Sequence, residues 1–209
     1  MNLGFLVFPD LEELDFAGPW EMAGMWGTYF AGPGKRLTVA QSLAPVVCAK
    51  GLRIIPQVSF AQCPQLDLLI VPGGQGTRKE TENSALIRFI SEQAEGCTAV
   101  LSVCTGAFLL HKAGLLTGKR ATTHWNSLDR LRALGDVTVV ETRIVRDGKI
   151  WTSAGVSAGI DLMLSFIADF AGEETAGKVQ LAAEYYPSER RYGALHECPQ
   201  APGYLKGPA

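Results

Sequence analysis

The hydrophobic pattern of the chain alternates between short, continuously apolar runs and longer segments in which apolar residues recur three or four positions apart. The runs at residues 3–8, 67–71 and 99–103 are typical of strands buried on both faces of a parallel sheet. The helical period is clearest over residues 83–96. Strands therefore alternate with helices, which predicts an α/β fold with a mostly parallel sheet and helices on both faces.

Shorter elements are predicted in the intervals between these segments. Lys50-Gly51 and Asp147-Gly148 are expected to form hairpin turns, and the Gly18-Pro19 pair is expected to begin a helix that continues to about Met25. Further strands are predicted at residues 36–43, 46–49, 52–55, 137–140, 142–145 and 149–152, with a short one inside 119–125. Further helices are predicted at residues 105–113, 127–134, 160–170 and 173–184.

The pattern indicates one domain over residues 1–185 and an irregular tail over residues 186–209. No internal repeat and no interdomain linker is visible in the sequence. The tail is rich in proline and glycine, so we expect it to pack on the domain or on a partner subunit.

Composition excludes several classes of partner. With 47% hydrophobic and 19% charged residues among 209, the chain has a globular composition, and its net charge of -2 gives no reason to expect nucleic acid or an acidic membrane surface. No apolar segment approaches the length of a membrane span, and the start lacks a basic leader, so we expect a cytoplasmic protein. The five cysteines are odd in number and widely spaced, which supports neither a disulfide framework nor a metal site.

The main chemical candidate is Cys104, which ends the apolar run at 99–103 just before a helical pattern. A cysteine at a turn between strand and helix is lifted above the carboxyl edge of the sheet, where α/β folds bind ligands. The start of the helix is expected to lower the pKa of the thiol. The alternative is a cysteine packed as a small hydrophobic residue.

Other candidates follow strand ends and belong to the same sheet edge. Asp15 comes after the first strand, either as a carboxyl partner of the cysteine or as a helix cap. Gly73 and Gly74 follow the second buried strand, either as a tight turn or with the Gly74 N–H free to donate to a developing negative charge. His124 follows a later short strand, either as a base for Cys104 or as a histidine satisfied by local hydrogen bonds.

Taken together, these motifs resemble the ThiJ/PfpI superfamily, which belongs to the class I glutamine amidotransferase-like folds. The resemblance covers about the first 185 residues. It rests on Gly4 to Pro9, Leu14-Asp15 to Gly18-Pro19, Val71-Pro72-Gly73-Gly74, Ser102-Val103-Cys104-Thr105-Gly106, Ala121-Thr122-Thr123-His124-Trp125 and Ala158-Gly159-Ile160-Asp161. It implies a flavodoxin-like three-layer sandwich with a nucleophile elbow at Cys104.

Within the superfamily, the chain is most similar to the isonitrile hydratases. That resemblance implies hydration of a small-molecule isonitrile to an N-substituted formamide, without a cofactor or a metal. Cys104 would attack the terminal carbon to give a thioimidate, and Asp15 would supply a proton. The backbone N–H groups of Gly74 and Thr105 would hold the substrate or an anionic intermediate, and the Thr105 hydroxyl would position water. The resemblance also implies a homodimer.

Two other readings share the same motifs. The first is a binding module that senses a small molecule or a redox change, as in the N-terminal domains of AraC-type regulators. Those chains continue into a helix-turn-helix domain, whereas this sequence ends in a tail rich in proline and glycine. The second is glyoxalase-like chemistry on a small dicarbonyl. Peptidase-like members place a histidine directly after the cysteine, and Thr105 in that position disfavours a protease.

Overall fold

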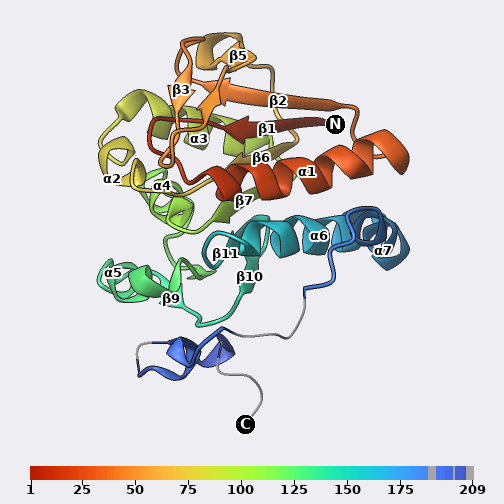
Figure 1. Ribbon diagram of the computed structural model, residues 1–209. Helices are drawn as coiled ribbons and strands as arrows, with labels where there is room; N and C mark the ends of the chain where they lie inside the picture. Colours follow the sequence, from red (N-terminus) through yellow and green to blue (C-terminus); the bar gives the residue numbers. More distant parts are fainter. Residues whose placement is uncertain (188–191, 200, 206–209) are drawn as a thin grey trace.

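The computed structural model describes residues 1–187, 192–199 and 201–205 and contains a seven-stranded sheet (Figure 1). Its strands are β1 (Asn2–Leu6), β2 (Lys35–Ala40), β5 (Val58–Ser59), β6 (Leu68–Val71), β7 (Ala99–Val103), β10 (Ile144–Asp147) and β11 (Ile150–Ser153). They lie in the order β10-β11-β7-β6-β1-β2-β5, and all neighbours are parallel except β10 and β11. This architecture confirms the predicted mostly parallel α/β fold.

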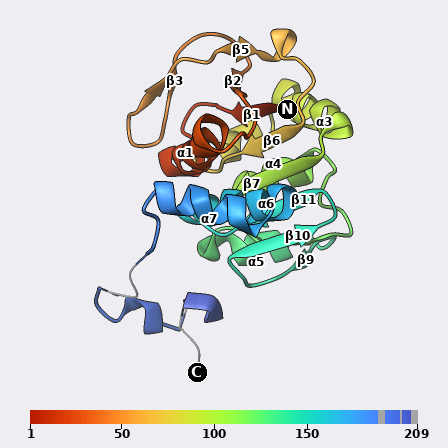
Figure 2. The same ribbon diagram turned by 90° about the vertical axis from the view of Figure 1, so that its right-hand side faces the viewer.

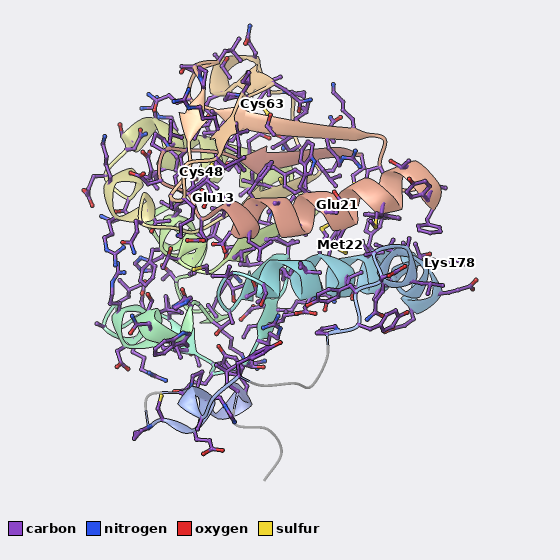
Figure 3. The ribbon with its side chains drawn as sticks, viewed as in Figure 1. Glu13, Glu21, Met22, Cys48, Cys63 and Lys178 are labelled. Atoms are coloured by element: carbon purple, nitrogen blue, oxygen red, sulfur yellow. The ribbon has the colours of Figure 1, made fainter. Side chains whose placement is uncertain are left out.

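Helices cover both faces of the sheet. They are α1 (Glu13–Tyr29), α2 (Thr77–Glu80), α3 (Ser84–Gly96), α4 (Gly106–Lys112), α5 (Leu128–Arg132), α6 (Ala158–Ala171) and α7 (Glu173–Ala182), with short 3-10 turns η1 (Phe60–Gln62), η2 (Trp125–Ser127), η3 (Leu195–Glu197) and η4 (Gly203–Leu205). Figures 1 and 2 show α1, α6 and α7 on one face and α3 and α4 on the other. Figure 3 shows Met22 between α1 and α6, where it is buried in the core.

The strand order places a topological switch point between β1 and β6. From β1 the chain moves outward to β2 on one side, and from β6 it moves through β7 to β11 on the other. This is the 2-1-3-4-5 order of flavodoxin-like folds, in which ligands bind where the order reverses. The segments after β1, β6 and β7 therefore meet at one edge, as the sequence predicts.

Two hairpin turns are where the sequence places them. The Asp147-Gly148 turn joins β10 and β11 in the main sheet, and the Lys50-Gly51 turn joins β3 (Val46–Val47) and β4 (Arg53–Ile54) in a separate two-stranded sheet. A second small sheet pairs β8 (Arg120–Ala121) with β9 (Thr138–Val139) in parallel. The four strands of these small sheets are each two residues long and pair only with one another.

The predicted start of the first helix is wrong. The helix α1 begins at Glu13 and continues through Pro19, so Asp15 lies in its first turn and not in a loop. Proline lacks the N–H that would bond to the carbonyl four residues earlier and is usually found at a helix start. Here long-range contacts hold the turn before Pro19: the N–H of Glu12 donates to the Gly73 carbonyl at 2.9 Å, and Gly18 packs on Ile160.

Several parts of the tail expected over 186–209 lie outside the described residues, namely 188–191, 200 and 206–209. The described tail contains only the turns η3 and η4. All five cysteines are free thiols, and Figure 3 shows Cys48 beside Glu13 and far from Cys63. Among the described helices, none combines the length and apolar character needed to cross a membrane.

Candidate active site

Cys104 lies at the sharp turn between β7 and α4, where the sequence predicts it. Its φ of 57° is in the left-handed region, which costs a residue with a side chain about 1–2 kcal/mol. Long-range bonds hold this conformation. The Cys104 N–H donates to the carbonyls of Ser153 at 3.2 Å and Ala154 at 3.1 Å, and its own carbonyl accepts from the Thr123 hydroxyl at 2.7 Å. The fold thus fixes the backbone of the candidate nucleophile from two later segments.

Asp15 is completely buried, and its two carboxyl oxygens differ in their hydrogen bonding. Oδ2 accepts the Gly73 N–H at 2.9 Å, whereas Oδ1 has no hydrogen-bond partner among the described residues. The pKa of Asp15 is raised from 3.8 to about 7, mainly by burial and to a smaller extent by the charge of nearby Glu12. The Gly73 N–H, and the nearby Cys104 side chain and Val156 backbone, act in the opposite direction. Asp15 can therefore carry a proton near neutral pH, as a proton donor must.

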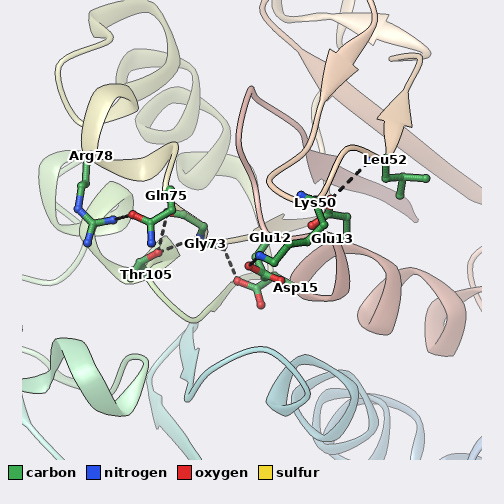
Figure 4. A network of polar contacts seen from close by, with 10 residues as sticks. Glu12, Glu13, Asp15, Lys50, Leu52, Gly73, Gln75, Arg78 and Thr105 are labelled. Atoms are coloured by element: carbon green, nitrogen blue, oxygen red, sulfur yellow. Dashed lines mark hydrogen bonds and ion pairs between the residues drawn. The ribbon is translucent and has the colours of Figure 1, made fainter.

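Gly73 lies between Asp15 and Thr105, the residue after Cys104 (Figure 4). A Cβ atom at this position would lie 2.5 Å from the Thr105 nitrogen and 2.9 Å from Oδ2 of Asp15. Real Cβ atoms essentially never make contacts this short, so only glycine lets the two groups approach the turn after β6.

The prediction that the Gly74 N–H is free to hold an anion is wrong. This N–H donates to the Thr105 hydroxyl oxygen at 2.9 Å, and the Gly74 carbonyl accepts from the Thr77 hydroxyl at 2.8 Å. Gly74 has a φ of 119°, which suits glycine, and its backbone is tied to α2 and to the elbow. The Thr105 hydroxyl therefore supports the turn after β6.

The expected lowering of the Cys104 pKa is also wrong. Burial raises the pKa of this thiol above its ordinary value, and the charge of Asp15 raises it further. The backbone and hydroxyl of Thr105 and the backbone of Val156 oppose the rise by hydrogen bonding. The helix start thus acts in the predicted direction, but desolvation outweighs it. A negative charge on the Asp15 carboxyl disfavours a second one on the Cys104 thiol, so the two groups titrate as a coupled pair.

Val156 is a backbone donor that the sequence did not indicate. Its N–H favours the charged forms of both Asp15 and Cys104, and Val156 lines the same pocket as Cys104. Val156 has a φ of 50°, a rare conformation for a β-branched residue. A valine in the sequence does not indicate a left-handed backbone. The loop between β11 and α6 imposes this conformation on Val156.

A pocket of about 150 Å³ opens beside Cys104 and is lined by all of the predicted residues except Gly73 and the fully buried Asp15. His124 is among the lining residues, together with Thr105 and Gly74. Its Nδ1 accepts the Asn126 N–H at 3.2 Å, which leaves the ring proton on Nε2. Burial lowers the pKa of His124, so the ring is neutral. No described hydrogen bond joins it to Cys104 or Asp15, which agrees with the locally satisfied alternative.

The polar rim of the pocket is the other part that sequence reasoning missed. Glu12, Gln75 and Arg78 line it, along with Asn126 and Ser127. Glu12 lies three residues before Asp15, and this spacing would have pointed to it had the helix start been placed correctly. Gln75 and Arg78 follow the Gly73-Gly74 turn, where a side chain belongs to the same sheet edge.

No metal centre is found in the part of the chain that the structure describes. Across those residues, no three histidine, cysteine, aspartate or glutamate side chains are grouped as metal binding requires. The expectation that the chemistry needs neither metal nor cofactor stays a prediction.

Comparisons with known proteins show which sequences and structures the chain is similar to. The chain is 41% identical over 189 residues to isonitrile hydratase of Pseudomonas putida, a match that covers 90% of this chain and 80% of the relative. It is 30% identical over 186 residues to the HTH-type transcriptional regulator GbdR of Pseudomonas aeruginosa, covering 85% of this chain and 49% of the regulator. The crystal structure of a ThiJ/PfpI family protein from Pseudomonas syringae matches with a TM-score of 0.85 and 34% identity, covering 98% of this chain and 82% of that one.

The family model described as DJ-1/PfpI family matches residues 1–169, which contain β1, the glycine turn after β6 and the cysteine elbow. The predicted resemblance to the ThiJ/PfpI group is confirmed. With most of its length matched by the family model and its fold matched by a solved member, the chain belongs to the DJ-1/PfpI family.

Proposed function

We propose that this protein hydrates an isonitrile to an N-substituted formamide, with Cys104 as nucleophile. The observation that carries the proposal is the buried pair of Asp15 and Cys104 in a chain 41% identical to an isonitrile hydratase. The pair supplies what the reaction needs, a nucleophilic sulfur and a carboxyl that holds a proton near neutral pH.

The proposed steps balance in atoms and charge. The Cys104 sulfur forms a bond to the terminal isonitrile carbon, and that carbon takes the one proton shared by the thiol and Asp15. The product is a thioimidate. Water then adds to the thioimidate carbon, and one of its protons passes through the Asp15 carboxylate to the substrate nitrogen, which leaves a tetrahedral intermediate with a hydroxyl group. The hydroxyl proton then passes to Asp15 as the carbon–sulfur bond breaks, which releases the formamide and restores the one proton shared by the pair. The N–H groups of Thr105 and Val156 support this path because they favour negative charge on the sulfur.

The test is turnover of an aryl isonitrile by the wild-type chain, with the formamide identified by mass spectrometry. Cys104→Ala is expected to abolish turnover, and intact-mass measurement during turnover is expected to detect the thioimidate on the wild-type protein alone. No formamide from any of several isonitriles would refute the proposal.

A sensing role is the second candidate, because GbdR is 30% identical over a segment that covers about half of that regulator. In that case isonitriles would not be turned over, and a small ligand would raise the melting temperature of wild type and of Cys104→Ala alike. Turnover of a small dicarbonyl in place of isonitriles would instead favour the glyoxalase-like reading.

We further infer a homodimer, a single domain over residues 1–185 and a cytoplasmic location. Exposed apolar side chains support the dimer. Leu14 near the start of α1, and Val47, Leu52 and Ile55 around the β3–β4 hairpin, are 39%, 47%, 48% and 73% exposed. Sedimentation at micromolar concentration is expected to give twice the 22.5 kDa chain mass, and a monomer would contradict the inference.

A further inference from the structure

The charge at the mouth of the Cys104 pocket is not balanced by the described residues. Glu12 lines the pocket, but its Oε2 is paired with Lys50 Nζ at 2.8 Å. His124 is neutral, since burial lowers its pKa. Arg78 is the remaining charged lining residue, and no carboxylate among the described residues lies within ion-pair distance of it. The rim therefore presents one uncompensated positive charge.

Arg78 is held towards the pocket by a neighbour. Its Nη1 donates to Oε1 of Gln75, and Figure 4 shows Gln75 between Arg78 and Thr105. This contact uses the oxygen of the Gln75 amide, and no described group accepts from its Nε2. A guanidinium and an amide NH₂ are thus available together beside the pocket. Guanidinium groups bind carboxylates with two parallel hydrogen bonds, which favours this anion over a neutral group.

The size and polarity of the pocket restrict what can be bound. Its volume of about 150 Å³ is below the ~300 Å³ at which typical drug-sized sites begin. Apart from Val156 and Cys104, the side chains that line it are polar, and no aromatic carbocycle is among them. A large aryl group would contact few apolar side chains in this pocket, whereas a short chain that ends in a charged group can bind Arg78 and Gln75.

Building on the proposed function, we propose that the preferred substrates are small isonitriles that carry a carboxylate, with Arg78 and Gln75 binding that carboxylate while the terminal carbon meets Cys104. The product is then an N-formyl amino acid or a close analogue. Arg78 is a specificity-determining residue and takes no part in bond making.

The test compares isocyanoacetate with its methyl ester, which has no charge on the remote group and is larger by one methyl group. For wild type, kcat/KM is expected to be about tenfold higher for the acid, the size expected of a hydrogen-bonded charge pair. Arg78→Met is expected to remove this advantage by raising KM for the acid, with the ester within about twofold of wild type.

Lys79→Met is the matched control. Lys79 is next to Arg78 in α2 but lines a different pocket, bounded by Phe8 and Phe60, so the same charge is lost without a change at the Cys104 pocket. Its acid-to-ester ratio is expected to equal that of wild type. N-formylglycine is expected to inhibit wild type competitively, and Arg78→Met much more weakly.

The outcomes separate this inference from the proposed function. Hydration of the ester at least as efficiently as the acid, or an equal loss for both substrates in Arg78→Met, overturns the carboxylate preference and leaves the hydratase intact. A loss of the preference in Lys79→Met also overturns it, because general surface charge would then be the cause. Failure to hydrate either compound or any aryl isonitrile overturns both.

Discussion

The N–H of Gly73 donates to Oδ2 of Asp15 at 2.9 Å, and this bond makes the two oxygens of the carboxyl unequal. An oxygen that accepts an N–H is a poor place for a proton, whereas Oδ1 has no described hydrogen-bond partner. A proton on Asp15 therefore belongs on Oδ1. The turn after β6 thus orients the acid as well as packing against it.

Replacing Asp15 with asparagine is expected to reduce kcat for an aryl isonitrile by about 10²–10⁴-fold, the usual contribution of a positioned proton donor. The variant keeps its shape, because the asparagine oxygen can still accept the Gly73 N–H. Initial rates, with circular dichroism as a check on folding, measure the effect. Glu80→Gln is the control, since Glu80 is also a buried carboxyl but lines the other pocket. Equal losses in the two variants would contradict a specific role for Asp15.

Asp15 is expected to make the folded state less stable as the pH rises. Its pKa is about 7 in the folded protein against an ordinary 3.8, so the folded state binds more protons between these values. The free energy of unfolding therefore falls from about pH 4 to pH 7, by up to ~4 kcal/mol. Urea titrations of wild type and Asp15→Asn at pH 5 and pH 8 measure this difference. Wild type should lose stability relative to the variant at the higher pH, and parallel behaviour would show that burial does not penalise this carboxylate.

Gly73→Ala is expected to lower both stability and activity. The added methyl group would lie 2.5 Å from the Thr105 nitrogen and 2.9 Å from Oδ2 of Asp15, and overpacking of this kind costs about 1–3 kcal/mol. Thermal unfolding and initial rates measure the two effects. Gly177→Ala in α7 is the opposite case, because no atom lies within 4 Å of a Cβ there, and it should gain up to ~1 kcal/mol. A fully active Gly73→Ala would mean that the turn can move without harm.

Thr105→Val is expected to destabilise the protein by about 1 kcal/mol, because the partly buried Gly74 N–H loses its acceptor. Thr105→Ser keeps the hydroxyl and should retain most of the stability. Melting temperatures measure the difference, and kcat for each variant reports whether the hydroxyl also acts in the reaction. Equal melting temperatures for the valine and serine variants would show that the bond to Gly74 contributes little.

The fold could be predicted largely from the apolar runs, because strands buried on both faces leave few other arrangements. The carboxyl ends of parallel strands meet at one edge of a sheet, and this also allowed Cys104, Asp15 and Gly73 to be predicted at the same edge. The predicted helix start at Gly18-Pro19 is wrong because contacts to the turn after β6 and to α6 outweigh the local preference of proline. The predictions of a free Gly74 N–H and of a lowered Cys104 pKa are wrong because hydrogen-bond partners and burial depend on segments distant in sequence.

The elbow backbone also has a consequence for when the site forms. The partners of Cys104 are Thr123, Ser153 and Ala154, all synthesised after it. A growing chain that has completed only β7 and α4 lacks the bonds that hold the left-handed turn, and contacts between distant residues form slowly. The backbone that holds the nucleophile is therefore complete only once the chain has been made as far as Ala154.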